Sequence, residues 1–228
     1  MQAMINMVAT RQKAGTPTEL LRWYNDHVHL LLRFDGLDGA TLYRRSHALD
    51  PLNASPAPDY VCLYRFASMA TFADFEASQA KELARQVTQS GWGATGIEII
   101  QRSQYLAGGN WSGPANASGA SRRHIQCLDI AGAKRDSPRW IADRLYVATS
   151  SGDVRHCEWY TQADASSTQQ QAIVLASLSD DAINPARPWL RWWESTTSHG
   201  QTEPMGQAPD AITARWAADY GHVCAWQR

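Results

Sequence analysis

The sequence predicts an α+β fold made of two ferredoxin-like repeats in one chain, and three observations support this. The length of 228 residues suffices for two units of about 100 residues, each large enough to bury a core. The first half has the expected order strand-helix-strand-strand-helix-strand, which is the ferredoxin-like arrangement. The second half repeats this order with weaker spacing. Because each such sheet has helices on one face only, we expect the two sheets to cover each other as a single-chain α+β barrel.

The first repeat opens with a strand and an amphipathic helix. The strand, from Met4 to Arg11, has two largely apolar faces and is therefore expected to be central in its sheet. The start signal Gly15-Thr16-Pro17 introduces a helix over residues 18–32. One side of this helix is apolar and the other is charged. The apolar side carries Leu20, Leu21, Tyr24, His27, Val28, Leu31 and Leu32.

Three further strands and a second helix complete the first repeat. The strands are expected at residues 40–45, 60–66 and 97–106, and the first two are separated by a loop rich in Pro, Asn and Ser. We expect Thr71 to be the N-cap of the second helix, which runs to about Val87. Its buried side is predicted to consist of Phe72, Phe75, Leu83 and Val87.

A segment of Gly, Ser, Asn and Ala marks the expected boundary between the repeats. We predict a first repeat at residues 1–107, a linker at 108–121 and a second, degenerate repeat at 122–228. In the second repeat, strands are expected at 124–130, 154–162, 172–178 and 222–227, with helices from Ser137-Pro138 onward and at 188–194. The repeat is inferred from the order of elements, since the two halves share little residue identity.

Composition excludes several classes of partner. The net charge is −1, so no excess of Lys and Arg is present to neutralise phosphates, and we expect no nucleic acid partner. The apolar runs are far shorter than the roughly 20 residues that span a bilayer. Residues 1–10 lack the features of a signal peptide. We therefore expect a cytoplasmic protein that has no membrane partner.

One helical segment resembles a known family. Residues 20–31 (LLRWYNDHVHLL) resemble the first helix of EthD-like proteins of the dimeric α+β barrel superfamily, in which an aromatic pair precedes a His as Trp23 precedes His27 here. In that family the His lies near a pocket between helix and sheet. The similarity covers residues 1–107, but the Gly-Pro pair usual after the His is Val28-His29 here. The resemblance implies kinship with cofactor-independent monooxygenases, lactone isomerases, polyketide cyclases and decarboxylases.

Three residues of this helix are candidates for catalysis. An imidazole at the edge of the apolar face, as expected for His27, suits a general acid or base with a pKa near neutrality, although a buried His can simply bond a strand carbonyl. Tyr24 lies one turn earlier, where it could pair with His27, orient a substrate oxygen or serve only in the core. His29 points to the charged side and becomes a candidate only if the helix loosens. Two His at positions i and i+2 of a regular helix cannot chelate one metal, so no metal site is expected.

Four residues are candidates for substrate binding: Trp23, Tyr43, Tyr64 and Arg65. Tyr43 and Tyr64 lie on adjacent expected strands, and one of their two faces should line a cavity under the helices. Arg65 lies on the face opposite Tyr64, where it would form an ion pair between sheets. If the substrate is a carboxylate or enolate, Arg44, Arg45 or Arg65 would serve as an anion clamp.

No cofactor is expected from the sequence. Nucleotide-binding, α/β-hydrolase and zincin motifs are all missing. Some tandem ferredoxin-like proteins bind heme through a helical His in their second half. Here that half has His124, His156, His199 and His222, which fall mostly in expected strands or loops, so heme is disfavoured.

These observations lead to one main functional hypothesis and two alternatives. The main hypothesis is a cofactor-independent isomerase, lyase or cyclase that acts by acid/base catalysis on a small, apolar carbonyl or phenolic substrate. The first alternative is a non-catalytic small-molecule-binding or accessory protein of a catabolic or biosynthetic pathway. The second is a structural subunit with a filled interior. A homodimer of the whole chain stands as a further expectation, because folds of this kind often pair.

Overall fold

The computed structural model describes residues 2–46, 57–112, 122–131, 139, 141–143, 145, 154–163, 169–178 and 211–227. The chain divides into two compact units. The first comprises Met1–Arg45, Pro58–Leu106 and His222–Arg228, and the second comprises Ser46–Ala57 and Ala107–Gly221. No helix among the described residues is both long and apolar enough to cross a membrane.

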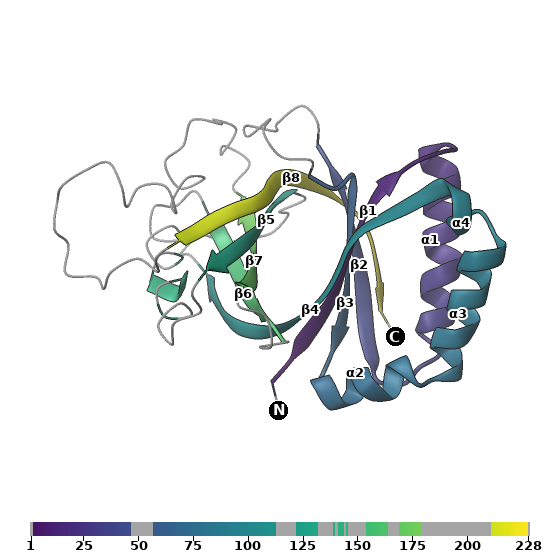
Figure 1. Cartoon of the computed structure of the whole chain (residues 1–228), viewed down its shortest axis with the longest axis horizontal. Helices are drawn as coiled ribbons and strands as arrows, with labels where there is room; N and C mark the ends of the chain where they lie inside the picture. The colour runs from purple at the N-terminus through teal and green to yellow at the C-terminus, as the bar shows by residue number, and fades with distance from the viewer. Residues whose placement is uncertain are drawn as a thin grey trace, which may run out of the picture. The chain divides into compact units, whose positions relative to one another are not determined.

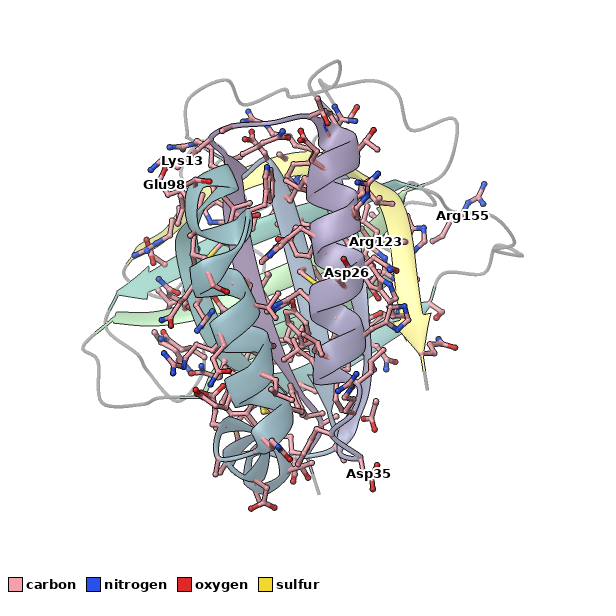
Figure 2. The ribbon with its side chains drawn as sticks, turned by 90° about the vertical axis from the view of Figure 1, so that its right-hand side faces the viewer. Lys13, Asp26, Asp35, Glu98, Arg123 and Arg155 are labelled. Carbon is pink, nitrogen blue, oxygen red and sulfur yellow. The ribbon has the colours of Figure 1, made fainter. Side chains whose placement is uncertain are left out.

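The first unit has the predicted β-α-β-β-α-β order (Figure 1). Its elements are β1 (Met4–Gln12), α1 (Pro17–Leu31), β2 (Leu37–Arg45), β3 (Tyr60–Phe66), α2 (Met69–Glu76), α3 (Gln79–Ser90), α4 (Gly93–Gly96) and β4 (Ile97–Ser112). The strands are antiparallel and lie in the order β4-β1-β3-β2. Figure 2 shows α1 and α3 side by side on one face of this sheet. The central position predicted for the first strand is confirmed, since β1 pairs on both sides.

Helix α1 begins at the predicted start signal. The Thr16 hydroxyl accepts a hydrogen bond from the Glu19 backbone N–H at 3.3 Å, and the Glu19 carboxylate accepts one from the Thr16 N–H at 2.7 Å. These two bonds form a capping box, with Pro17 at the first helical position, where its missing N–H costs nothing. The buried side of the helix is the predicted one and contains Leu20, Tyr24, Val28 and Leu31.

The second predicted helix is broken into two. The N-cap of α2 is Ser68, whose hydroxyl accepts from the backbone N–H of Thr71 at 3.2 Å, so the prediction that Thr71 is the cap is wrong. Ser78 caps α3 in the same way. A serine at this point ends one helix and starts another, because its hydroxyl replaces a helical partner of the backbone. The break changes the helical phase, so Val87 is 40% exposed and Ala84 is buried in its place.

A β-bulge changes which residues of β4 face the helices. Along the pairing of β1 with β4, Ala9 lies opposite Gln101 and Thr10 lies opposite Ile99, so Ile100 has no partner in the register. One extra residue reverses the alternation of side chains beyond it. Ile99 and Arg102 therefore lie on the same face of the sheet. Strand β4 also continues through residues 107–112, into the expected linker, and residues 113–121 lie outside the described part.

The second unit has a similar antiparallel sheet. Its strands are β5 (Arg122–Ala131), β6 (Val154–Gln162), β7 (Gln169–Leu178) and β8 (Ala211–Gln227), in the order β8-β5-β7-β6. Helical residues at 139, 141–143 and 145 pack Ile141 and Leu145 into its core. The helix predicted at 188–194 and the start signal Ser137-Pro138 lie outside the described residues.

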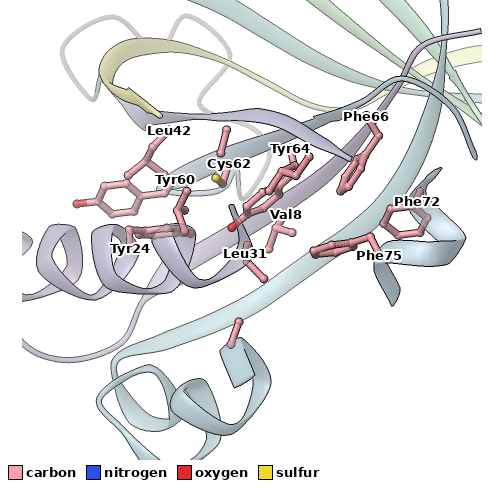
Figure 3. Close-up of a cluster of buried hydrophobic side chains, with 14 of the residues drawn as sticks. Val8, Tyr24, Leu31, Leu42, Tyr60, Cys62, Tyr64, Phe66, Phe72 and Phe75 are labelled. Atoms are coloured by element: carbon pink, nitrogen blue, oxygen red, sulfur yellow. The ribbon is translucent and has the colours of Figure 1, made fainter. Parts of the chain in front are cut away.

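The core of the first unit lies between its helices and its sheet (Figure 3). Phe66 of β3 contacts two phenylalanines of α2, with ring centroids 5.3 Å from Phe72 and 5.0 Å from Phe75. Tyr24 and Tyr64 are buried on the same side of the sheet. These buried aromatic side chains form an aromatic layer, and this layer borders an internal cavity.

Candidate active site

The first unit contains a cavity of about 390 Å³ between its helices and the helix-facing side of its sheet. Residues of β1, β3 and β4 line its sheet side, and residues of α1, α2 and α3 line its helix side. Its polar and aromatic lining includes Asn6, Trp23, His27, Tyr64, Thr88 and Arg102. A cavity of this volume, with apolar walls and a few polar groups, is typical of a small-molecule site.

His27 is held in this cavity by contacts with two helices. Its imidazole ring stacks on the indole of Trp23, with centroids 4.9 Å apart and an angle of 19° between the planes. Its Nδ1 lies 3.2 Å from the Thr88 hydroxyl oxygen of α3. The same hydroxyl donates a hydrogen bond to the Ala84 carbonyl oxygen at 2.9 Å. The ring is therefore fixed from both sides.

These contacts determine which nitrogen of His27 carries the proton. A threonine hydroxyl has one hydrogen and two lone pairs. Because the hydrogen of Thr88 goes to the Ala84 carbonyl, we assign the Thr88 oxygen as the acceptor of a hydrogen bond from His27 Nδ1–H. The neutral imidazole then has a lone pair on Nε2, which makes that atom a Brønsted base.

The charge state of His27 differs from the prediction. Burial, followed by the positive charges of Lys81 and Arg102, lowers the pKa of His27 to about 4, rather than leaving it near neutrality. A buried imidazolium loses its hydration, and two nearby cations repel it. His27 is consequently neutral at physiological pH and can accept a proton there.

The lowered pKa of His27 predicts a pH-dependent stability. Its folded-state pKa of about 4 lies below the ordinary value of 6.5, so between these values the unfolded chain binds a proton that the folded chain does not. The free energy of unfolding should therefore fall by about 3 kcal/mol as the pH decreases from about 7 to about 4. Urea unfolding at several pH values measures this fall. A His27→Gln variant should lack this component, and a parallel fall in both proteins would contradict the assignment.

The tyrosines of the cavity remain protonated. The Tyr24 hydroxyl lies 3.0 Å from the Thr10 hydroxyl, so its hydrogen-bond partner is Thr10 and not His27. Burial raises the pKa of Tyr24, and it raises the pKa of Tyr64 well above the ordinary value. Both phenols can donate or accept hydrogen bonds, but neither supplies a charge at neutral pH.

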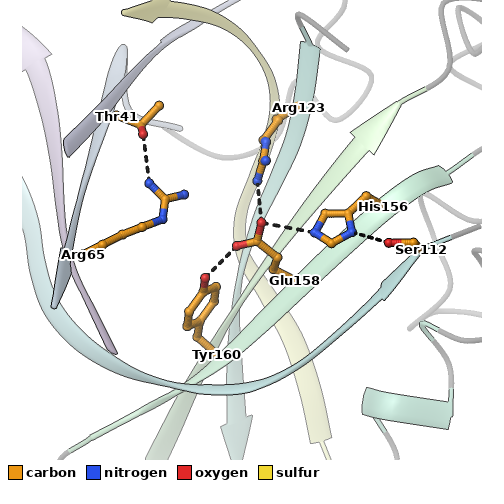
Figure 4. Close-up of polar contacts among 7 residues, drawn as sticks. All are labelled: Thr41, Arg65, Ser112, Arg123, His156, Glu158 and Tyr160. Carbon is orange, nitrogen blue, oxygen red and sulfur yellow. Dashed lines mark hydrogen bonds and ion pairs between the residues drawn. The ribbon is translucent and has the colours of Figure 1, made fainter. Parts of the chain in front are cut away.

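The structure brings four of the seven predicted site residues together: Trp23, Tyr24, His27 and Tyr64 all line the cavity. His29 is exposed on α1 and does not line it. Tyr43 and Arg65 lie on the opposite face of the sheet. There the ring of Tyr43 packs edge-on against the ring of His222, with the two centroids 6.0 Å apart. Arg65 donates a hydrogen bond to the Thr41 hydroxyl at 2.9 Å (Figure 4). Strand alternation separates these two residues from the cavity.

Three cavity residues were missed by the sequence analysis. Asn6 is the single polar side chain within residues 4–9, an otherwise apolar run, which is a signal that could have been noticed. Arg102 reaches the cavity because of the β-bulge, which the sequence does not reveal. Thr88 of α3 contacts His27 of α1, and the two residues are 61 positions apart in the sequence. Only the tertiary structure therefore brings them together.

The described histidines of the second half do not suit heme. His156 Nδ1 lies 2.9 Å from the Ser112 hydroxyl and its Nε2 lies 3.2 Å from Glu158, which also accepts hydrogen bonds from Arg123 and Tyr160 (Figure 4). His124 Nδ1 lies 2.6 Å from Asp219, and its Nε2 lies 2.8 Å from the Gln126 amide. Both nitrogens of each ring are engaged, so neither is available to iron. His222 is exposed on β8, and His199 lies outside the described residues.

Comparisons with known proteins give structural neighbours only. Neither protein-family models nor curated protein sequences match this chain. Among solved structures, a protein assigned as a monooxygenase from Fusobacterium nucleatum has a TM-score of 0.62 at 9% identity, covering 100% of this chain and 95% of its own. An anthrone oxidase-like protein has a TM-score of 0.60 at 8% identity, covering 99% and 93%. A chlorite dismutase variant from Candidatus Nitrospira defluvii has a TM-score of 0.55 at 6% identity, covering 97% and 92%.

At these identities the likeness shows the fold alone. The neighbours span almost the whole chain and belong to the dimeric α+β barrel proteins. The predicted fold class, α+β with two ferredoxin-like repeats in one chain, is thereby confirmed.

Proposed function

We propose that this protein is an enzyme that removes a proton from a small carbonyl or phenolic compound bound in the cavity, with His27 Nε2 as the general base. One observation carries the proposal: His27 lines a ligand-sized cavity, and the hydrogen bond assigned from its Nδ1–H to Thr88 leaves Nε2 as the nitrogen with the basic lone pair. A positioned base of this kind accelerates proton transfer by about 10² to 10⁴. The EthD-like resemblance of the α1 segment, which includes this His, agrees with the proposal.

The other cavity residues have complementary roles in this proposal. Removal of a proton from carbon or a phenol leaves a negative charge on oxygen, which Lys81, a cation near His27, would stabilise. The rings of Trp23 and Tyr64 form walls suited to a flat substrate. These walls and the buried aromatic layer favour an aromatic compound over a sugar or a peptide.

The same proton removal can begin two different reactions. Return of the proton elsewhere, or loss of a group, gives an isomerase, lyase or cyclase. Alternatively, the carbanion of an anthrone-type compound can react with molecular oxygen, so that a methylene and O₂ become a carbonyl and water with no other reductant. The second outcome is favoured by the neighbours named as a monooxygenase and as an anthrone oxidase-like protein. A binding protein without catalysis would not need a base with a fixed tautomer.

Anthrone itself provides a direct test. Incubated with the protein in D₂O without oxygen, anthrone should exchange its methylene hydrogens for deuterium faster than in buffer, as followed by NMR. Admission of oxygen should then produce oxygen uptake and anthraquinone if the reaction is an oxidation. Exchange without oxygen uptake would instead indicate the isomerase, lyase or cyclase class. Tight binding of anthrone with neither exchange nor uptake would contradict the proposed function and favour the binding protein.

A further inference from the structure

The charges around the cavity are all of one sign. Among the described residues, its lining includes the cations Lys81, Arg85 and Arg102 and no Asp or Glu. Lys81 forms an ion pair with Glu76, and Arg85 forms one with Glu82 at 2.6 Å. Two of the three cations therefore already have a carboxylate partner outside the cavity.

Arg102 is different from the other two cations. It lies opposite Val8 in the register of β1 with β4, and the bulge at Ile100 turns it toward the helices. None of the described residues forms an ion pair or a hydrogen bond with its guanidinium. Arg102 is also exposed to solvent, so it lies where the cavity opens. A planar guanidinium in this position matches the geometry of a carboxylate.

A second polar group inside the cavity lacks a partner. Asn6 is only 4% exposed and lines the cavity, and its Oδ1 has no hydrogen-bond partner among the described residues. A buried acceptor without a partner costs about 1 to 3 kcal/mol, so a ligand hydroxyl that reached it would be bound favourably. Most of the remaining lining of the cavity is apolar or aromatic, with Tyr64 and Phe75 among these residues.

We propose that the ligand of this cavity is a hydroxylated aromatic carboxylate, whose carboxylate binds Arg102 while its ring system occupies the space beside His27 and Asn6. This inference rests on the proposed function and names the substrate class for the same site. A bound carboxylate would also offset the positive field of Arg102 at His27. Because that field is one cause of the lowered pKa of His27, the bound ligand should raise this pKa and so strengthen the base.

A matched pair of probes tests the proposal by binding alone. A fluorescent hydroxynaphthoate and its uncharged carboxamide have nearly the same shape, so their Kd values isolate the effect of the carboxylate. In the wild type the acid should bind at least about tenfold more tightly, which corresponds to about 1.4 kcal/mol. The variant Arg102→Gln should lose this preference and leave the carboxamide affinity unchanged. The control Arg11→Gln removes a cation that pairs with Glu98 at 3.8 Å outside the cavity, and it should behave as wild type.

Several outcomes would overturn the proposal. Equal affinity of the wild type for the acid and the carboxamide would do so, as would equal losses for both probes in Arg102→Gln. Failure of both probes to bind at millimolar concentration would count against it as well. The test is separable from that of the proposed function. If the protein prefers the acid but does not turn over anthrone, proton abstraction is refuted and the carboxylate site is supported. If it turns over uncharged anthrone but shows no preference for the acid, proton abstraction is supported and the carboxylate site is refuted.

Discussion

Replacement of His27 by glutamine should lower the rate of deuterium exchange into anthrone by about 10² to 10⁴. Glutamine has a similar length and can still donate a hydrogen bond to Thr88, but it has no atom that accepts a proton at neutral pH. The affinity for the compound should change little, since Trp23 and Tyr64 still form the walls. Exchange rates measured by NMR, together with the circular dichroism spectrum, separate loss of the base from loss of the fold.

A matched control lies two residues away. His29→Gln removes an imidazole from the exposed side of the same helix and should leave the exchange rate unchanged. The pH profile adds an independent check, because the wild-type rate should fall only as the pH approaches the His27 pKa of about 4. Equal losses of rate in the two variants, or an unchanged rate in His27→Gln, would refute the assignment of His27 as the base.

The second large effect is expected for Thr88, which acts through His27 as a positioning residue. In Thr88→Val the acceptor for His27 Nδ1–H is gone, so the proton can move to Nε2 and remove the basic lone pair. One lost hydrogen bond of about 1 kcal/mol predicts a decrease in kcat of about fivefold, with KM nearly unchanged. Nitrogen NMR of the imidazole should show the change of tautomer directly. Thr88→Ser keeps the hydroxyl and should restore both the tautomer and the rate.

Ser90→Ala provides the comparison for this experiment. The Ser90 hydroxyl donates to the Gln86 carbonyl at 2.7 Å, which is the same kind of bond that Thr88 makes to Ala84, but Ser90 does not line the cavity. Its loss should alter neither the tautomer of His27 nor kcat. An unchanged imidazole spectrum in Thr88→Val would show that Thr88 does not position His27.

Local patterns in the sequence were sufficient for much of the first unit. The helical periodicity predicted α1, because this helix buries one continuous set of apolar side chains. Short, largely apolar runs predicted β1 and β3, because both faces of these strands are buried. The capping box at Thr16 and Glu19 is encoded within four residues, so the start of α1 was predictable. The same periodicity placed Tyr24 and His27 on one side of α1, and the structure has both at the cavity. Boundaries that depend on pairing with distant strands, such as the extension of β4 to Ser112, were not visible locally.

What the sequence by itself determined was the order of elements and the inward side of α1, since both follow from interactions between residues a few positions apart. The tertiary structure alone decided the contact from which the tautomer of His27 is assigned, and the position of Arg102 at the cavity. The first depends on a contact between α1 and α3, and the second depends on a bulge in β4 that turns Arg102 toward the helices. Contacts between segments far apart in the chain, and a register that one unpaired residue reverses, leave no periodic trace in the sequence.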